Sequence, residues 1–405
     1  MSTIITAGNK GPGIRSDCFV TLELTASGGC KVDVTSKVKA LYGASHLKLA
    51  KEMLAYYGIE NASMTIEDSG ALDFVLAARI EAVIRGGLGI DKEFLGDMLP
   101  SNDYSTKKDR FRHSRLYLPG NSPKLMLNAG IHDSDGIILD LEDSVAPTVK
   151  EEARLLVRNA LRQVDFYGAE RMVRINQLPL GLKDLDYLVP HNVHVILIPK
   201  CESAEQVKQV DGRIQEIRDQ LGVPRTIYLM PIIESALGVV NAYQIASATE
   251  NVAAIAIGLE DYTADLGAKR TNQGEESFYA RSKVVNAARA AGIQPIDSVF
   301  SDVSDMEMLQ NVVSKSRAMG FAGMGCIHPR QIKVVNNAFS PSSEEFEHAQ
   351  RIVRAYDQAT QLGLGVISLG SKMIDPPVVK RAQQTINLAI RFGKMPANWK
   401  ENTVE

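Results

Sequence analysis

The 405-residue sequence has few cysteines and no long apolar run, and each absence excludes a class of protein. Its cysteines are scattered without CxxC spacing, so they indicate neither a zinc site nor a disulfide framework. The histidines form no HExxH or HxxxH arrangement. No run approaches the roughly 18 apolar residues of a membrane helix, and the first residues hold no apolar core of a signal peptide. We therefore expect a cytoplasmic protein with reduced thiols.

An excess of charge of one sign is also lacking. The formal net charge is −3 and the pI is about 6.2. No basic field is therefore available to attract nucleic acid or an anionic membrane. A hydrophobic content of 45% is ordinary for a soluble protein, and the length predicts more than one domain.

A polar stretch at 96–112 divides the chain into two modules. It contains a proline and a charge run but no sustained apolar period, which predicts a linker. The first module would then cover residues 1–95, and the second would begin at residue 113.

The first module shows a compact α/β pattern. Two alternating segments, 18–24 and 30–36, flank a turn-like SGG and predict a β-hairpin. Apolar residues at helical spacing predict a helix over 38–58. Residues 63–68 form a third strand pattern, whereas 72–87 fits a strand in its first half and a helix in its second.

The second module repeats a strand–helix unit eight times. The strand-like runs are 115–120, 136–143, 171–177, 193–200, 227–234, 252–261, 292–300 and 320–329. This repeat predicts a (β/α)8 TIM barrel, which we place at 113–340. A doubly wound open sheet is the alternative, but no GxGxxG motif follows the first strand.

Two of these apolar runs end abruptly in acid, the first at Glu234 and the second at Asp261. Apolar runs rarely tolerate charge unless it is paired or binds a metal. Parallel neighbouring strands would present both carboxylates at one edge, a geometry that suits Mg²⁺. An ion pair or a helix N-cap is the alternative explanation.

Polar groups end nearly every predicted strand, and in a barrel these ends surround the active site. The remaining groups are Asn121, Glu142, Asp143, Arg174, Asn176, Lys200, Asp297 and His328. Together they predict a polar cavity able to bind a metal, although Lys200, Asp297 or His328 could each be a loop residue without a role.

Several motifs at these positions resemble a known family. The segment from about 112 to about 395, with PIIESALGVVNA, IGLEDYTADLGAKRTNQGEESFYAR and GFAGMGCIHPRQI, resembles the citrate lyase β-subunit family. Residues about 5–90, with SDCFVTLEL and IEDSGALDFVLAARIEAVIR, resemble the citrate lyase acyl carrier (γ) subunit. The chain thus looks like two subunits of one enzyme complex fused together.

The resemblance implies a retro-Claisen cleavage of a citryl thioester to oxaloacetate and an acetyl thioester. Mg²⁺ would bind Glu234 and Asp261 and act as Lewis acid and template. Arg174 would pair a substrate carboxylate, or alternatively form a salt bridge to Glu142 or Asp143. These two acids would orient the metal-bound waters and Arg174 and so take part in catalysis. Asn176 and Arg112 are further candidates for substrate binding.

Related lyases supply an acid from a G-K-M-[IV]-D motif in a carboxy-terminal lid of a neighbouring subunit. The matching stretch is GSKMID at 370–375, which implicates Asp375. From sequence alone, an Asp before two prolines is a turn or cap residue. The resemblance implies that 341–405 is a helical lid and oligomerisation segment of a homo-oligomer, a trimer or a multiple of it.

Two departures from the family concern how the substrate is carried. The carrier family attaches a phosphoribosyl-dephospho-CoA arm to the first serine of a Ser-Ser-Asp sequence, where this chain has Arg15 and only Ser16 remains. Before the barrel, Arg112-His113-Ser114 replaces a common Arg-Arg-Ser run, so a contact to the nucleotide part of the thioester would differ.

These departures leave three hypotheses. The chain is a fused citryl-carrier lyase with the arm on Ser16, working with a separate transferase (α) subunit. Alternatively, it cleaves a free acyl-CoA, such as citramalyl-, malyl- or citryl-CoA, and the first module is an unmodified docking domain. In the third, it is a non-catalytic carrier or assembly subunit.

Overall fold

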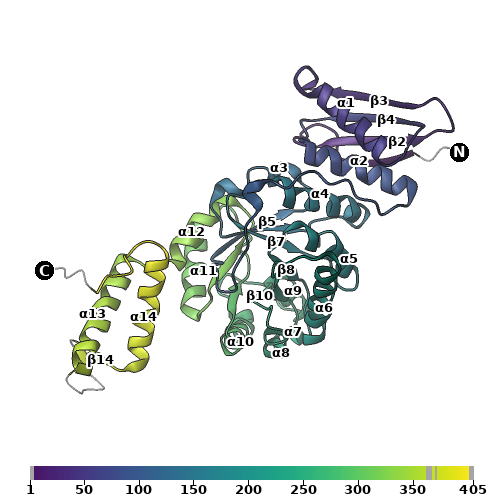
Figure 1. The fold of residues 1–405 in the computed structure, drawn as a ribbon. Helices are drawn as coiled ribbons and strands as arrows, with labels where there is room; N and C mark the ends of the chain where they lie inside the picture. The colour runs from purple at the N-terminus through teal and green to yellow at the C-terminus, as the bar shows by residue number, and fades with distance from the viewer. Residues whose placement is uncertain (1–3, 362–366, 370–371, 401–405) are drawn as a thin grey trace.

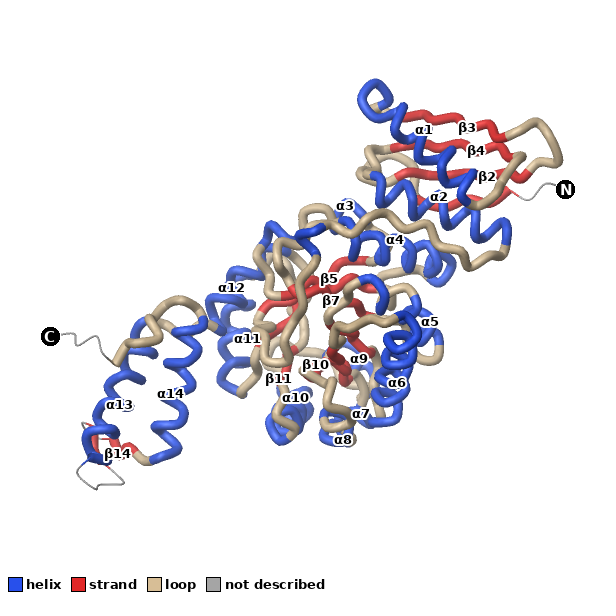
Figure 2. Tube along the Cα trace, in the orientation of Figure 1, coloured by secondary structure: helices blue, strands red, loops and turns tan. Residues whose placement is uncertain are grey.

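The computed structural model describes residues 4–361, 367–369 and 372–400. Three parts follow one another along the chain (Figure 1): a small α/β domain, a parallel barrel and a two-helix hairpin that projects from the barrel. The tube in Figure 2 shows the barrel strands enclosed by helices. Among the described residues, no helix is long and apolar enough to cross a membrane.

The amino-terminal domain is a four-stranded sheet covered by two helices. Its elements are β1 Ile4–Gly8, β2 Cys18–Leu24, β3 Cys30–Ser36, α1 Lys39–Tyr56, β4 Ala62–Asp68 and α2 Asp73–Leu88. The strand order is β1-β2-β4-β3. Buried and accessible residues alternate along β4, since α1 and α2 cover one face of the sheet and the other stays open.

The predicted hairpin between residues 18–24 and 30–36 is wrong. β4 lies between β2 and β3, antiparallel to β2 and parallel to β3. Its two large apolar side chains, Met64 and Ile66, are buried in the centre of the sheet, so burial outweighs the local SGG turn signal. The predicted helix over 38–58 and the strand over 63–68 are confirmed, whereas β1 was not predicted.

The segment 72–87, which fits both strand and helix patterns, is helical as part of α2. Ten of its residues are buried, because α2 packs on the sheet with one side and on helix α4 of the barrel with the other. A helix covered on two sides loses the polar face that normally reveals a helical period.

The eight predicted barrel strands are all confirmed. They are β5 Ser114–Pro119, β6 Gly136–Asp140, β7 Glu170–Arg174, β8 Val195–Ile198, β9 Tyr228–Ile233, β10 Ala254–Ile257, β11 Gln294–Asp297 and β12 Gly323–Cys326. Neighbours pair in parallel, and β12 pairs with β5 to close the barrel. Closure excludes the open doubly wound sheet.

Helices surround the strands, and the apolar side chains form two layers, one between the strands and the helices and one inside the barrel. They are α3 Pro123–Met126, α4 Lys150–Gln163, α5 Leu180–Asp186, α6 Ala204–Leu221, α7 Ala236–Val240, α8 Ala242–Ala246, α9 Leu259–Asp265, α10 Glu275–Ala290, α11 Met306–Met319 and α12 Pro329–Phe339. A separate cluster, including Ile138, Met172 and Leu197, fills the barrel interior. The barrel is therefore a packed core whose chemistry must lie at its ends.

The predicted linker lies against the barrel. Apart from a 3-10 turn at Pro100–Asn102, residues 96–112 form neither helix nor strand. Asn102 is fully buried, and its side-chain amide donates to carbonyl oxygens at the end of α4, including that of Val164 at 2.8 Å. Arg171 of β7 in turn donates to the Asn102 carbonyl at 2.8 Å. These bonds fix the connection in place.

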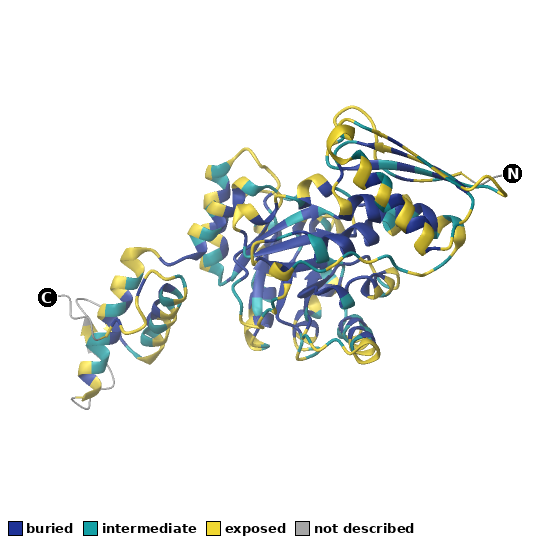
Figure 3. Ribbon diagram, turned by 45° about the horizontal axis from the view of Figure 1, so that its top comes forward, coloured by how far each residue is buried: buried dark blue, intermediate teal, exposed yellow. Residues whose placement is uncertain are grey.

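The carboxy-terminal hairpin has a small core of its own. Its elements are α13 Ser343–Gln361, β13 Ile367–Leu369, β14 Lys372–Ile374 and α14 Pro376–Arg391. Ile352, Ile386 and Trp399 belong to this core. At its base, the Phe392 ring stacks on Phe111 with centroids 4.8 Å apart. Much of the hairpin surface is exposed, in contrast to the barrel strands (Figure 3).

Candidate active site

The carboxyl ends of the barrel strands surround a cavity of about 420 Å³. Most of the polar residues that line it come from the strand ends identified in the sequence. They include Asp143, Arg174, Glu234, Asp261 and Asp297, and Asp140, which was not predicted from the sequence, joins them. The structure therefore brings the predicted carboxylate pair and Arg174 to one cavity.

Glu234 directly follows β9 and is only 7% exposed. The backbone N–H of Lys200 donates to its carboxylate at 2.8 Å. On its other side lies Gly258, where a Cβ atom would come within 2.5 Å of the Glu234 Oε1 atom. A glycine is therefore needed at position 258 for the carboxylate to keep its place.

Burial raises the pKa of Glu234 to about 7. The Lys200 N–H and the Arg174 charge oppose this rise, and the nearby carboxylates of Glu142 and Asp261 add to it. A carboxyl group that is costly to ionise in the free protein gains most from a cation beside it.

The stability of the metal-free protein should depend on this carboxyl group. Since the folded-state pKa of Glu234 lies above its ordinary value of 4.5, its contribution to stability is present below pH 4.5 and is lost as the pH rises through about 7. Glu234→Gln should abolish this dependence. From pH 5 to pH 8, we expect the free energy of unfolding of the variant to rise relative to that of the wild type by about 2–3 kcal/mol. Urea unfolding of both proteins with EDTA measures it, and parallel pH curves would contradict it.

Asp261 lies in the first turn of α9, just after β10, and is 43% exposed at its side chain. Its carboxylate lies 3.6 Å from the Lys200 ammonium. Lys200 thus connects the pair, since its backbone binds Glu234 and its side chain approaches Asp261. The ion-pair alternative therefore describes part of the geometry at Asp261.

The N-cap alternative is wrong for both acids. Ser235 caps α7, since its hydroxyl accepts the N–H of Gly238 at 3.1 Å. The N-cap of α9 is Gly258. Glu234 and Asp261 therefore keep their carboxylates available to the cavity.

This pair fits a hard divalent cation with few protein ligands. Across the described residues, no group of three or more His, Cys, Asp and Glu side chains is arranged for a metal. A cation at Glu234 and Asp261 would therefore keep most of its positions for water and substrate oxygens. Mg²⁺ binds in this way, usually through one or two carboxylates.

Arg174, at the end of β7, is held by acids of the neighbouring β6 and its loop. Its Nε and Nη2 groups donate to the two oxygens of Asp140 at 2.6 and 2.7 Å. Its Nη1 atom lies 2.8 Å from Glu142. The salt bridge foreseen to Glu142 is present, but Asp140 is the principal partner and was missed. Two N–H groups of the guanidinium remain for a ligand in the cavity.

Glu142 and Asp143 differ in their surroundings. Glu142 is buried, and Gln177 donates to its carboxylate at 2.9 Å. Burial raises its pKa, although the charge of Arg174 acts against this. Asp143 is more than half exposed and lies 3.9 Å from both Arg174 and Lys200. Both acids therefore lie within ion-pair distance of the two cations of the site, Arg174 and Lys200.

Two candidates for substrate binding lie away from the cavity. Arg112 precedes β5 at the opposite end of the barrel, is fully buried and makes two 2.7 Å bonds to Glu170. The side-chain amide of Asn176 donates to Asp184 of α5 at 2.9 Å. Both side chains hold the scaffold together, and we withdraw them as substrate contacts.

The three strand-end residues that could have been loop residues without a role have different surroundings. Asp297 lines the cavity and pairs with Arg281 of α10 at 3.2 Å. His328 caps α12, where its Nδ1 atom accepts the N–H of Arg330 at 3.2 Å. Lys200 contacts both carboxylates of the pair, Glu234 through its backbone and Asp261 through its side chain. His328 has a structural role as a helix cap.

Asp375 lies outside the cavity of its own chain. It is the N-cap of α14, and its carboxylate accepts the N–H of Val378 at 3.1 Å. It follows β14, which lies at the end of the hairpin farthest from the barrel (Figure 1). Residues 370–371 of its motif lie outside the described residues.

Comparison with known proteins agrees with the fold and identifies the family. Residues 113–329 match the family model described as HpcH/HpaI aldolase/citrate lyase, and residues 11–86 match one described as malonate decarboxylase delta subunit. Citrate lyase subunit beta of Leuconostoc mesenteroides subsp. cremoris is 40% identical over 284 residues, covering 69% of this chain and 94% of that protein. Human mitochondrial citramalyl-CoA lyase is 34% identical over 290 residues, covering 69% and 85%.

A solved structure with the same barrel contains a magnesium ion. Protein CitE of Mycobacterium tuberculosis, in complex with magnesium, acetoacetate and coenzyme A, matches with a TM-score of 0.59 and 30% identity. The match covers 70% of this chain and 99% of that one. The chain is a carbon–carbon lyase that belongs to the HpcH/HpaI aldolase/citrate lyase family and carries an amino-terminal acyl-carrier-like domain.

Proposed function

We propose that the barrel cleaves a citryl thioester to oxaloacetate and an acetyl thioester in a Mg²⁺-dependent retro-Claisen reaction. The observation that carries the proposal is the shared cavity of Glu234, Asp261 and Arg174 at the carboxyl end of the barrel. The citrate lyase relative at 40% identity and the magnesium in the CitE complex support it.

The reaction assigns a task to each group of side chains. The hydroxyl of the citryl group loses its proton, the carbon–carbon bond breaks, and its electrons pass to the α-carbon of the acetyl thioester, which then takes up a proton. When bound at Glu234 and Asp261, Mg²⁺ supplies Lewis-acid stabilisation of the hydroxyl and keto oxygens. Arg174, fixed by Asp140 and Glu142, offers its free N–H groups to a substrate carboxylate.

The proton for the acetyl carbon would come from Asp375 of a second copy of the chain. The hairpin carries Asp375 away from its own cavity, which favours action on a neighbour. A surface for such a neighbour is available on α7 and α10, where the apolar side chains Leu237, Val240, Phe278 and Tyr279 are each more than half exposed. We therefore propose a homo-oligomer.

Replacing Arg174 with Lys should lower kcat/KM by about 10–100-fold, because an ammonium cannot bind Asp140 through two parallel bonds and still face the cavity. Steady-state kinetics on the thioester measures the effect. The matched control is Arg213→Lys on α6, where the arginine forms exposed ion pairs with Asp186 and Glu216. Equal kcat/KM for both variants would remove Arg174 from substrate binding.

A free acyl-CoA is the second candidate substrate. The citramalyl-CoA lyase relative and the coenzyme A in the CitE complex favour it, as does the single serine at the attachment position. In this case the amino-terminal domain would carry no prosthetic arm and no transferase subunit would be needed. The non-catalytic alternative is wrong, since the chain belongs to a family of lyases.

Two measurements decide between the substrates. Turnover of citryl-, citramalyl- and malyl-CoA with Mg²⁺ gives the acyl preference, and we expect citryl-CoA to have the highest kcat/KM. Intact mass of protein from its native host shows whether Ser16 carries an arm. Turnover of citramalyl- or malyl-CoA well above that of citryl-CoA, by protein without added mass, would replace the citryl proposal with the free acyl-CoA one.

A further inference from the structure

The amino-terminal domain is joined to the barrel by a buried interface between α2 and α4. One continuous apolar core contains residues of both, among them Leu76 and Ile80 of α2 and Leu155 of α4. Interfaces between domains that move relative to each other are usually smaller and more polar. The shared core indicates that the two domains form one body.

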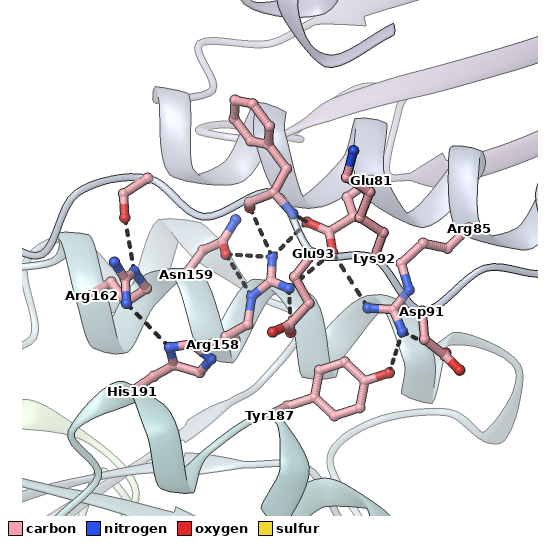
Figure 4. Close-up of polar contacts among 12 residues, drawn as sticks. Glu81, Arg85, Asp91, Lys92, Glu93, Arg158, Asn159, Arg162, Tyr187 and His191 are labelled. Atoms are coloured by element: carbon pink, nitrogen blue, oxygen red, sulfur yellow. Dashed lines mark hydrogen bonds and ion pairs between the residues drawn. The ribbon is translucent and has the colours of Figure 1, made fainter. Parts of the chain in front are cut away.

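A fully buried ion pair crosses this interface (Figure 4). Arg158 of α4 donates to both oxygens of Glu81 of α2, at 2.9 and 2.6 Å, and neither side chain is exposed. Arg158 also binds Glu93 at 2.8 Å, and the adjacent Asn159 donates to the carbonyl of Phe74 at 3.0 Å. Separating the domains would leave these charges without partners, which is strongly unfavourable unless water reaches them.

A second buried ion pair ties the loop before β2 to the barrel. Arg79 of α2 makes two bonds to Asp17, at 3.1 and 3.0 Å, and a third to Glu152 of α4, at 3.0 Å. Glu152 also accepts the backbone N–H of Gly8 at 2.8 Å. Both ends of the loop 9–17 are therefore fixed to the first turn of α4.

The loop 9–17 contains Ser16, the candidate attachment site. Ser16 is half-buried, and its N–H donates to the carbonyl of Ser69 at 3.0 Å. Arg79 reaches the carbonyl of Asn121 at 3.5 Å, two residues after Pro119, which lines the cavity. The loop thus lies at the carboxyl end of the barrel, on the same edge as the candidate active site.

From this geometry we infer that the amino-terminal domain is a fixed part of the lyase and presents the thioester to the cavity of its own chain. The inference rests on the proposed function. The thioester is either attached covalently to Ser16 in loop 9–17 or bound beside this loop as free acyl-CoA. The domain does not travel between enzymes, so any partner that loads the thioester has to dock on this chain.

A distance measurement in the full-length protein tests the fixed arrangement directly. Spin labels are attached at Asp33→Cys on β3 and Lys208→Cys on α6, both exposed, after replacing the half-exposed Cys30 with Ser. In oligomers diluted with an excess of unlabelled chain, so that only distances within one chain contribute, pulsed electron resonance should give one narrow distance distribution, unchanged by Mg²⁺ and citryl-CoA. A broad distribution, or one that shifts with the ligands, would overturn the inference whether or not the protein is active on that substrate.

Charge reversal at the interface tests its role in catalysis. Glu81→Arg should broaden the distance distribution and lower kcat/KM for the thioester by about tenfold or more, because a detached domain loses its high effective concentration at the cavity. The double variant Glu81→Arg/Arg158→Glu should restore part of both. Glu52→Lys, which breaks an exposed ion pair with Lys48 on α1, is the matched control and should change neither. A detached domain with wild-type kcat/KM would overturn the inference.

Ser16→Ala separates the two sources of the thioester. Covalent presentation predicts loss of turnover together with an added mass on the wild type, and free acyl-CoA predicts neither. Either result supports presentation of the thioester by a fixed amino-terminal domain, provided that Glu81→Arg lowers kcat/KM for the same substrate. If the wild type turns over none of the thioesters, the proposed function fails, whereas the distance distribution still reports on the fixed arrangement.

Discussion

Glu234→Gln and Asp261→Asn are each expected to abolish cleavage, lowering turnover by about 10³-fold or more. Each change keeps the size of the side chain but removes the charge on which a divalent cation depends. At Glu234, the loss of a charge that is buried at 7% exposure should also leave the fold intact or more stable. The loss of function should therefore appear in turnover and in Mg²⁺ affinity, without any decrease in the melting temperature.

The comparison needs a carboxylate of the same barrel that lies outside the cavity. Glu275, exposed in the first turn of α10, provides it, and Glu275→Gln should retain wild-type turnover. Calorimetric titration with Mg²⁺ and steady-state kinetics on all three variants measure the prediction. A Glu234 or Asp261 variant that turns over at near-normal rate at low Mg²⁺ would show that the metal site lies elsewhere.

Asp375→Asn should slow turnover by about 10²–10³-fold while Mg²⁺ affinity stays unchanged, because the proton donor acts on the acetyl carbon and not on the metal. Asn is the informative replacement. Asp375 caps α14 by accepting the N–H of Val378, and an Asn side chain preserves that bond whereas Ala would also destabilise the helix. Unchanged turnover would remove Asp375 from the mechanism.

Mixing two inactive variants tests whether Asp375 acts on a neighbouring copy. A mixed oligomer of Asp375→Asn and Glu234→Gln subunits contains cavities with an intact metal pair beside an intact hairpin from the other subunit. Activity should therefore reappear after the two proteins are unfolded together and refolded. If activity stays at the level of the separate variants, Asp375 acts within its own chain or has no catalytic role.

The barrel could be predicted because each of its strands is encoded by a short stretch of consecutive residues. Each strand is a short apolar run, and the polar residue at its end marks the edge where the cavity lies, as at Glu234 and Asp261. Partner choice at that edge was less predictable. Asp140, Glu142 and Asp143 lie within four residues, and only the end of β6 at Asp140 decides which acid binds Arg174 through two parallel bonds.

The two substrate contacts that the structure does not support could not be recognised from local sequence. Arg112 lies in a motif that suggested substrate binding, yet it precedes β5 and therefore lies at the end of the barrel opposite the cavity. Asn176 follows β7, but its side chain is bound by Asp184 of α5.

The interface between α2 and α4 could have been predicted from the sequence. Arg79 and Glu81 are charged residues within an apolar helix, and such charges need buried partners.

The most direct test of the central claim is the release of oxaloacetate from citryl-CoA, measured by its reduction with NADH and malate dehydrogenase. We predict equimolar oxaloacetate and acetyl-CoA with Mg²⁺, no release after EDTA, recovery on adding Mg²⁺ back, and no release from Glu234→Gln. Release that persists in EDTA, or that Glu234→Gln supports at the wild-type rate, would contradict a Mg²⁺-dependent site at Glu234 and Asp261.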